Sequence, residues 1–540
     1  MELLLSKFFT QHTSEKAGFI SQNGTADPTV NALEYDSRKV KPGALFFALR
    51  GVHTDGSLYI KDAVKNGAVV IVHENDIEQF QDNIVYIKVK DARFAMSPIS
   101  ASFYGFPSRR LLVTGVTGTE GKSTTVYLIW QLLRLMGKKA GFISTVQHCL
   151  GGEVFTNTEH QTTPEATVIQ KMLREMADNN CEYAVLEASS HGLSAKTNRL
   201  GDVDFCAGVL TNITHEHLEF HGTWEQYRDD KANLFRIVNN YAHNDGVPFI
   251  EPFGVVNNDD KSSRYIMKLS NNSIFRYSPA GRDGDLILLT ISSSAWGNWY
   301  LVTIPDTDEQ FEIRDQLPGA YNSGNVLGAT LTVAHLLNIP IREVVPHIKY
   351  LKPVRGRMTS VGGKQPFEIV VDYAHTPSSF HTIFPPLRAR LDKTGGRIIS
   401  LFGSAGERDT HKRAEQGKIA AHYSDFIILT DEDPRGERPR DILLEIESGV
   451  CKDQGLRIVK AVDHPDMIID QNRAVFERDK NLFLIPDRPA AIRKALSLAH
   501  KGDLVLLLGK GHENSIIYKD RVMPFDEITE TEKALAEMGF

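Results

Sequence analysis

The chain is poor in cysteine. Four cysteines occur among 540 residues, and no two of them form a CxxC pair. Neither a zinc ribbon nor a disulfide framework is therefore expected. Long hydrophobic runs are also lacking, since no stretch of about 18 apolar residues occurs that would span a membrane. Residues 1–16 mix charges with too short an apolar run for a signal peptide. We expect a cytoplasmic protein without membrane insertion.

The charge is not dominated by one sign. Lys and Arg number 61 and Asp and Glu number 68, which gives a formal net charge of −7. This balance argues against general binding to nucleic acid, although a local basic pocket stays possible. No internal repeat or low-complexity tract is present, and the length suits about three domains. We expect a monomer that binds no nucleic acid.

Apolar strand-like runs alternate with helical patterns over most of the chain. A short strand, a Gly-rich turn, a helix over 123–136 and another strand form a βαβ unit, which predicts a parallel α/β sheet. The stretch 286–304 is rich in β-branched residues and predicts an antiparallel excursion. Strands are expected at 44–49, 68–73, 111–113, 140–143, 183–186, 207–210, 369–371, 398–402, 426–429 and 504–508.

The strongest motif is TGTEGKST at residues 117–124, between a predicted strand and a predicted helix. Backbone N–H groups of a Gly-rich turn at a helix N-terminus bind phosphate. Lys122 would then reach the terminal phosphates, and the Ser123 hydroxyl would ligate Mg²⁺. The strict GxxxxGK[ST] spacing fails, because Val116 holds the first Gly position. A turn without a ligand is the alternative, but the context favours nucleotide binding.

Two more polar segments follow predicted strands. EASSHGL begins with Glu187, a strand-end carboxylate that could bind Mg²⁺, and TNITHEHLEFH at 211–221 holds three His and two Glu. From the residues alone, Glu187 reads more readily as a solvated strand end. The His-rich segment fits a cation or phosphate site and an exposed helical face equally well. Lys231 reads as a surface charge.

In the last third of the chain, four polar loops each follow a strand. Because carboxyl ends of parallel strands meet at one edge of a sheet, these loops should converge on a ligand there. Their sequences are DYAHTP at 372–377, FGSAGERDTHKR at 402–413, TDEDPRGERPR at 430–440 and GKGHE at 509–513.

Taken in order, these motifs resemble the Mur ligase family of ATP-dependent, amide-forming enzymes of peptidoglycan precursor synthesis. The chain is most similar to the branch that adds a diamino acid to a UDP-N-acetylmuramoyl dipeptide. TGTEGKST resembles the family's TGTNGKT, with Glu120 in place of Asn. Further matching motifs are YDSR at 35–38, GVHTDG at 51–56, QTTP at 161–164, SSHGL at 189–193, LPGAYNSGN at 317–325 and GRM at 356–358.

The resemblance implies three domains of α/β class. They are a small N-terminal domain over 1–108 that binds the UDP substrate, a central P-loop parallel-sheet domain over 109–351 that binds ATP, and a C-terminal Rossmann-like domain over 352–540 that binds the amino acid.

The resemblance also implies roles for individual residues. ATP would contact Gly118, Thr119, Glu120, Gly121, Lys122, Ser123, Thr124, Asn322, Asn325, Arg357, Asp372 and His375. The UDP-N-acetylmuramoyl-peptide would contact Ser37, His53, Thr54, Thr162, Thr163, Ser189 and Arg199. The diamino acid would contact Arg408, Asp433, Arg435, Gly509 and Glu513.

Catalysis is implied to depend on Lys122, His217 and Lys231. Mg²⁺ would bind Ser123, Glu187, His217 and Lys231. Lys231 matches a lysine that is carbamylated in this family, which converts a cation into a carboxylate-like ligand. Carbamylation needs a neutral amine, and therefore a lysine pKa depressed by burial or by neighbouring cations.

The diamino acid is predicted from EDPR at 432–435, where family members that use meso-diaminopimelate have DNPR. Glu432 and Asp433 would favour a distal ammonium and repel a second carboxylate. Arg435 keeps a guanidinium that could bind a carboxylate. We expect lysine or ornithine rather than meso-diaminopimelate.

Two alternatives remain open. The first is another ligase of the same fold, such as a folylpolyglutamate synthetase; the DSR and HTDG motifs and the EDPR and GKGHE pair argue against it. The second is a P-loop nucleotide-binding regulator without ligase activity. Phosphate release that depends on both a UDP-muramoyl dipeptide and an amino acid would distinguish a ligase from a regulator.

Overall fold

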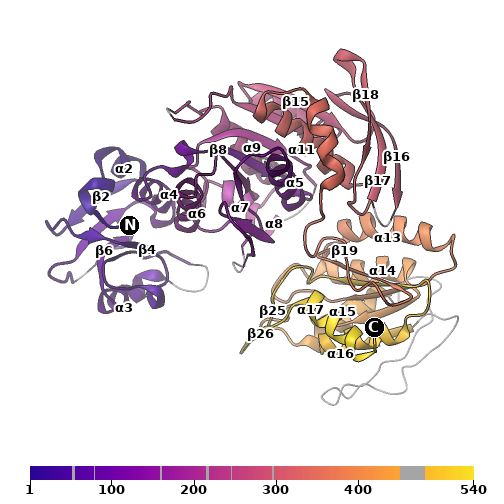
Figure 1. The fold of residues 1–540 in the computed structure, drawn as a ribbon. Coiled ribbons are helices and arrows are strands. Elements are labelled where there is room, and N and C mark those ends of the chain that lie inside the picture. The colour runs from indigo at the N-terminus through magenta and orange to yellow at the C-terminus, as the bar shows by residue number, and fades with distance from the viewer. Residues whose placement is uncertain are drawn as a thin grey trace. The chain divides into compact units, whose positions relative to one another are not determined.

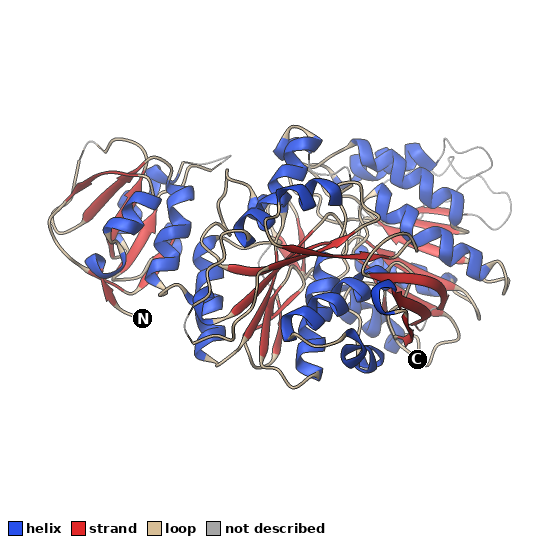
Figure 2. Cartoon of the chain, turned by 90° about the horizontal axis from the view of Figure 1, so that it is seen from above, coloured by secondary structure: helices blue, strands red, loops and turns tan. Residues whose placement is uncertain are grey.

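The computed structural model describes residues 1–51, 55–77, 79–157, 161–214, 218–244, 246–294, 297–450 and 481–540. These residues form two compact units, Met1–Lys352 and Pro353–Phe540. In Figure 1 the second unit is found by its orange to yellow colour. Strands lie between helices in both units, as Figure 2 shows.

The first sheet of unit Met1–Lys352 has five strands, and four of them run parallel. Only β2, at one edge, is antiparallel to its neighbour. Helix α4 (Ala92–Phe103) packs its buried residues on this sheet. The strand order is β2 (Phe19–Asn23), β7 (Val85–Val89), β6 (Ala68–His73), β5 (Ala44–Phe47) and β4 (Ala32–Glu34).

The second sheet of the same unit has eleven strands. Its middle is parallel from β9 to β16, and antiparallel strands extend it at both ends. The strand order is β11 (Val154–Thr156), β10 (Gln147–Cys149), β9 (Ala140–Ile143), β12 (Tyr183–Glu187), β8 (Leu112–Thr117), β13 (Phe205–Leu210), β14 (Phe253–Asn257), β15 (Ser273–Ser278), β16 (Leu286–Ser294), β17 (Gly297–Ile304) and β18 (Glu309–Arg314).

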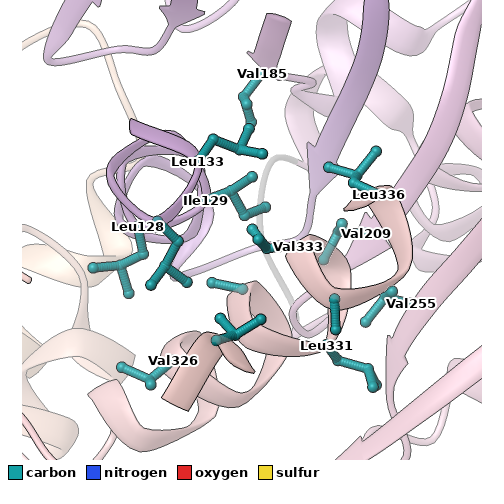
Figure 3. Close-up of a cluster of buried hydrophobic side chains, with 14 of the residues drawn as sticks. Leu128, Ile129, Leu133, Val185, Val209, Val255, Val326, Leu331, Val333 and Leu336 are labelled. Carbon is teal, nitrogen blue, oxygen red and sulfur yellow. The ribbon is translucent and has the colours of Figure 1, made fainter. Parts of the chain in front are cut away.

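Helices cover both faces of this sheet. On one face α5 (Lys122–Leu135) and α11 (Asn322–Leu337) meet the central strands, and on the other lie α6 (Ala166–Asp178) and α9 (Trp224–Val238). Alternation along β8 explains the two layers, since Leu112 belongs to the first cluster and Val113 to the second. Figure 3 shows the first cluster, with Leu128, Ile129, Leu133, Val185, Val209, Val255, Val326, Leu331, Val333 and Leu336 labelled.

Unit Pro353–Phe540 holds a six-stranded sheet that is parallel except for its edge strand β19. Helices α13 (Pro377–Leu391), α14 (His411–Tyr423) and α15 (Pro439–Val450) cover one face, and α16 (Arg488–Leu498) and α17 (Glu527–Glu537) cover the other. The strand order is β19 (Thr359–Ser360), β20 (Glu368–Asp372), β24 (Leu504–Leu508), β21 (Ile398–Phe402), β22 (Phe426–Leu429) and β23 (Asn481–Leu484).

The predicted α/β class is confirmed, and several strands lie where expected, among them β6, β9, β21 and β24. Strand β8 is longer than predicted and runs into the Gly-rich motif, because Val116 and Thr117 are fully buried. The antiparallel excursion is confirmed in β16 and β17, yet β16 also pairs in parallel with β15 and so continues the same sheet. Among the described residues, no single helix combines the length and apolar composition needed to cross a membrane.

Candidate active site

The Gly-rich loop lies between β8 and the first turn of α5, as its sequence predicts. Gly121 has a φ of +82°, and a Cβ at this position would approach Oδ1 of Asn325 to 2.4 Å. Only glycine fits this combination of backbone and close contact. Lys122 begins α5, and its Nζ donates a hydrogen bond of 2.7 Å to the carbonyl of Thr119. The lysine is therefore folded over the loop.

The backbone of Glu120 is held by the end of the neighbouring strand β13. Its N–H donates to Oδ1 of Asn212 at 2.9 Å, and its carbonyl accepts from the Thr211 hydroxyl at 2.6 Å. These contacts fix the loop through the main chain of Glu120. The replacement of the family's usual Asn therefore leaves these backbone contacts in place.

Two of the expected metal ligands are in contact. The hydroxyl of Ser123 donates to Oε2 of Glu187 at 2.8 Å, and the backbone N–H of Thr145 donates to the same oxygen at 2.8 Å. Ser123 and Glu187 are both buried. A hydroxyl beside a carboxylate is a donor set that suits Mg²⁺. Glu187 is therefore not a solvated strand end.

Lys231 is almost fully buried, with 1% of its surface exposed, so its interpretation as a surface charge is wrong. Its Nζ donates to the carbonyl of Gly118 at 2.5 Å and lies 4.5 Å from the centre of the Tyr227 ring. The Tyr227 hydroxyl lies 3.0 Å from Oγ1 of Thr119. Helix α9 thus contacts the Gly-rich loop at two points. His217, the other expected metal ligand, lies outside the described residues.

A buried histidine that contacts helix α9, His221, was not singled out by the sequence. Nδ1 of His221 lies 2.7 Å from Oδ2 of Asp230, and Nε2 lies 3.1 Å from the hydroxyl of Ser190. All three side chains are buried. The His-rich segment was a signal, but the sequence does not tell which of its histidines turns inward to helix α9.

The two asparagines expected at ATP lie in the first turn of α11. Nδ2 of Asn325 donates to Oδ1 of Asn322 at 2.9 Å, and Oδ1 of Asn325 accepts from the Thr125 hydroxyl at 3.2 Å. Nδ2 of Asn322 donates to the carbonyl of Pro318 at 2.7 Å. Asn325 therefore lies against helix α5 and Gly121 of the Gly-rich loop, and Asn322 supports Asn325.

Three residues expected at the muramoyl-peptide lie together. Oγ1 of Thr163 donates to the carbonyl of Glu187 and accepts from the N–H of Ser189, both at 3.0 Å. Nη1 of Arg199 donates to the carbonyl of Thr163 at 2.8 Å. Nη2 of Arg199 binds the buried carboxylate of Glu165 at 2.9 Å, a partner that the sequence did not indicate.

The remaining substrate residues are less connected. Thr162 is half-buried beside Thr163. Ser37 is buried in a short 3₁₀ turn after β4, where its carbonyl accepts from the Asn66 side chain at 2.9 Å. His53 and Thr54 lie outside the described residues.

In unit Pro353–Phe540, Asp372 ends strand β20 as predicted. Its carboxylate accepts from the N–H groups of Met358 and Ala374, both at 2.7 Å. Burial raises the pKa of Asp372, while the positive charge of Arg357 opposes this rise. The Arg357 guanidinium lies 4.8 Å from the centre of the Tyr373 ring. Nδ1 of His375 lies 2.9 Å from the Tyr373 carbonyl, so the expected nucleotide residues of this unit are adjacent.

The loops after β22 and β24 meet, as their positions after parallel strands predict. Nζ of Lys510 donates to Oδ1 of Asp433 at 2.9 Å and also binds Oε2 of Glu513. The N–H of Ile517 donates to the same Asp433 oxygen at 2.9 Å. The sequence argument treated Asp433 as free to attract an ammonium of the substrate. In the structure it is already paired with Lys510. Lys510 was missed because nothing in GKGHE shows which side chain turns inward.

Several buried polar atoms at this edge have no hydrogen-bond partner among the described residues. They are Oδ1 of Asp431, Oε2 of Glu432, Nε of Arg435 and Nδ1 of His512. Arg435 has a φ of +53°, a conformation that is rare and costly for a residue with a side chain. Gly509 lets Glu432 approach, since a Cβ there would lie 3.1 Å from Oε2 of Glu432. Arg408 is exposed in the loop after β21.

Comparisons with known proteins identify the family of this chain. The sequence matches three family descriptions in order: "Mur ligase family, catalytic domain" over residues 29–104, "Mur ligase middle domain" over 116–333 and "Mur ligase, glutamate ligase domain" over 356–511. The structure superposes on a UDP-N-acetylmuramoyl-L-alanyl-D-glutamate–2,6-diaminopimelate ligase with a TM-score of 0.60 at 24% identity, covering 100% of both chains. A Mycobacterium tuberculosis folylpolyglutamate synthase shares the fold with a TM-score of 0.55 at 13% identity over 76% of this chain and 91% of its own.

Sequence relatives are closer than these structures. A UDP-N-acetylmuramyl-tripeptide synthetase of Treponema denticola is 48% identical over 95% of both chains. One of Roseiflexus is 41% identical over 95% of this chain and 96% of its own. A UDP-N-acetylmuramoyl-L-alanyl-D-glutamate–2,6-diaminopimelate ligase of Caldanaerobacter subterraneus is 35% identical over 95% and 96%. The chain therefore belongs to the Mur ligase family of three-domain, ATP-dependent ligases, and within it to the MurE-like branch.

Proposed function

We propose that this enzyme joins a diamino acid to UDP-N-acetylmuramoyl-L-alanyl-D-glutamate at the expense of ATP. The observation that carries the proposal is the contact of Ser123 with Glu187 beside a lysine-bearing Gly-rich loop. The names of the relatives supply the substrate class. Residues 1–108 would bind the uridine end, 109–351 the ATP and 352–540 the amino acid.

The chemistry requires activation of a carboxylate. A carboxylate oxygen of the substrate attacks the γ-phosphorus of ATP, the bond to ADP breaks, and an acyl phosphate forms. The amine of the diamino acid then attacks the acyl carbon, phosphate leaves with the bonding electrons, and the amine loses a proton. Lys122 would neutralise charge on the transferring phosphoryl group. Water must be excluded, because it would hydrolyse the acyl phosphate.

Ser123 and Glu187 would hold one Mg²⁺, and Lys231 in carbamylated form would hold a second together with His217. A bound Mg²⁺ would supply charge neutralisation at the phosphates. Burial of Lys231 supports the modification, because desolvation favours the neutral amine that reacts with carbon dioxide. The carbonyl of Gly118 accepts an N–H of this amine and holds it beside the Gly-rich loop.

The muramoyl-peptide would lie along Thr162, Thr163, Ser189 and Arg199, with Ser37, His53 and Thr54 at its uridine end. Nη1 and Nη2 of Arg199 already bind the Thr163 carbonyl and the Glu165 carboxylate, so Arg199 would also hold Thr163 in place for the substrate. Asn322, Asn325, Arg357, Asp372 and His375 would complete the contacts with ATP, together with the loop from Gly118 to Thr124.

For the diamino acid we propose lysine or ornithine rather than meso-diaminopimelate. Glu432, Asp433 and Glu513 outnumber the one ammonium of Lys510 in their cluster. Oε2 of Glu432 is buried and has no partner among the described residues, so an ammonium of the substrate would relieve its desolvation. Gly509 and Glu513 would hold the α-amino and α-carboxylate end of the amino acid, and Arg435 and Arg408 would lie opposite each other at its side chain.

An end-point assay tests the proposal. The enzyme is incubated with ATP, Mg²⁺, UDP-N-acetylmuramoyl-L-alanyl-D-glutamate and each of lysine, ornithine and meso-diaminopimelate, and products are read by mass. We expect a product heavier by one amino acid residue and one phosphate released per product. ATP hydrolysis that is indifferent to both co-substrates would instead support a nucleotide-binding regulator.

A further inference from the structure

A single buried ammonium joins two loops of unit Pro353–Phe540. Lys510, in the loop after β24, is fully buried and binds Asp433 in the loop after β22. The two residues are 77 positions apart in the sequence. Lys510 also binds Glu513 in its own loop. The ammonium therefore sets the distance between two carboxylates that belong to different loops.

Arg488 joins the same two loops a second time, at the points where they leave strands β22 and β24. Its Nη1 donates to the carbonyl of Asp431 at 3.0 Å and its Nη2 to the carbonyl of Leu508 at 2.7 Å. Its guanidinium also pairs with Glu527, and neither side chain is exposed. Arg488 thus holds the two loops where they leave their strands. Lys510 joins them two residues farther along, at Asp433, next to Glu432.

Lys510 acts through its partners rather than on a ligand. An ammonium has three donors, and two of them are committed to Asp433 and Glu513. Burial alone would lower the pKa of Lys510, but the charges of Glu513 and Asp433 outweigh this and raise it, so the ammonium stays charged. Each carboxylate has about four acceptor positions, which leaves room for a second donor.

The formal charges around Lys510 bear on which amino acid would bind. By themselves Glu432, Asp433, Glu513 and Lys510 carry a formal net charge of −2, and positive charge is added nearby by Arg435 of the same loop and by Arg357, which acts on Tyr373 together with Glu432 and Glu513. Without Lys510, three carboxylates would lie together, and their mutual repulsion would favour protonation or separation of the loop tips. With Lys510, two carboxylates are held in place, and Oε2 of Glu432 has no hydrogen-bond partner in the described part of the chain.

We propose that Lys510 is a positioning residue that sets amino-acid selectivity, by holding the carboxylates of Asp433 and Glu513 in place where they would receive the cationic side chain of the substrate. This inference rests on the proposed ligase function. It predicts that changing Lys510 alters recognition of the amino acid and leaves recognition of the UDP substrate, whose expected residues lie in unit Met1–Lys352, unchanged.

The test compares Lys510→Arg with Lys501→Arg, the same exchange at an exposed lysine just before strand β24. Arginine keeps the charge but spreads it over a larger planar guanidinium, which does not match the place of a compact, fully buried ammonium between Asp433 and Glu513. We expect the KM for lysine to rise about tenfold in Lys510→Arg, and the preference for lysine over meso-diaminopimelate to fall by a similar factor. The KM for the UDP substrate should stay within about twofold, and Lys501→Arg should match wild type.

A second variant, Lys510→Gln, removes the charge and keeps a hydrogen-bond donor, and thermal unfolding is followed for all proteins. A lysine KM within about twofold of wild type in both variants would overturn the inference. So would a parallel rise of all KM values, or failure of both variants to fold, because each would mark a purely structural role. A wild-type enzyme that forms no product would overturn the proposed function and this inference with it, whereas an active wild type with unaffected variants would overturn this inference alone.

Discussion

Ser123 at the start of α5 and Glu187 at the end of β12 are in contact although 64 residues separate them, with the hydroxyl 2.8 Å from the carboxylate. The contact follows from topology. Strands β8 and β12 pair in parallel, so the turn after one and the last residue of the other reach the same edge of the sheet. A second contact, from the N–H of Thr145, holds the carboxylate in one orientation. The pair is thus preformed before any cation binds.

Replacing Glu187 by Gln should lower ligation by about 10²-fold or more, because the amide keeps the size of the side chain but removes the charge that would bind Mg²⁺. Ligation measured against Mg²⁺ concentration should show a higher requirement in the variant. Glu182→Gln, at an exposed position next to the same strand, serves as the control and should behave as wild type. An unchanged Mg²⁺ dependence of Glu187→Gln would contradict the assignment.

Lys122→Ala should abolish ligation and leave the fold intact. The side chain is only half-buried, and the hydrogen bond it makes among the described residues goes to the Thr119 carbonyl in its own loop, so little packing is lost. Product formation and the thermal midpoint are measured together, with Lys139→Ala, an exposed lysine beyond the other end of α5, as the control. Retained turnover, or an unfolded variant, would count against a role in phosphate binding.

Lys231→Ala should be nearly inactive, and added short carboxylic acids should restore part of the activity. A small carboxylate could occupy the space of the missing side chain and replace the carbamate oxygens as ligands. The matched control is Lys268→Ala in α10 (Ser263–Leu269), where the lysine is exposed. Normal turnover of Lys231→Ala would exclude the metal role. If a folded Lys231→Ala variant is inactive and is not rescued, the lost hydrogen bond to the Gly118 carbonyl would be the better explanation for its inactivity.

Asp431 makes stability depend on pH. Burial raises its pKa from an ordinary value of 3.8 to about 7, against a hydrogen bond from Tyr518. Between these two values the folded state binds more protons than the unfolded state, so this group's stabilising contribution is lost as the pH rises toward 7. Asparagine cannot ionise and escapes this loss. Asp431→Asn should therefore gain on the order of 2–3 kcal/mol relative to wild type between pH 5 and pH 8.

Urea unfolding at several pH values measures this difference. Asp520→Asn removes an exposed carboxylate from the same unit and should run parallel to wild type. A difference between Asp431→Asn and wild type that does not change with pH would show that the carboxyl group of Asp431 titrates normally.

Much of the framework could be predicted from sequence because hydrophobic pattern and turn residues act locally. The apolar run at 140–143 is strand β9 with the predicted bounds, and the helix predicted over 123–136 is α5. The loops that carry the candidate site residues could be predicted for the same reason, since their polar residues directly follow buried strands. Parallel pairing then brings those loops together without further information.

Pairing of individual side chains could not be predicted in this way. The sequence indicates that Asp433 and Lys510 both follow strands, but their contact depends on how two loops 77 residues apart fold over one edge. Lys231 is similar, because its surroundings are polar in sequence while α9 turns it under the Gly-rich loop. A sequence does not distinguish a charged side chain that is exposed from one that is buried and paired. Only the fold shows which of the two it is.

The choice of diamino acid is the sharpest test of the charges in unit Pro353–Phe540. Lysine, ornithine and meso-diaminopimelate are supplied together at equal concentration to wild type, Glu432→Gln and Asp433→Asn, and the three products are separated by mass. Wild type should favour lysine and ornithine. Glu432→Gln should lose about tenfold of that preference, because the removed charge belongs to the carboxylate with an unpartnered buried oxygen. Asp433→Asn should shift the preference in the same direction but less, since Lys510 already pairs with this carboxylate, and the new amide offers donors to a second carboxylate. A wild-type enzyme that strongly prefers meso-diaminopimelate would contradict selection by charge in this pocket.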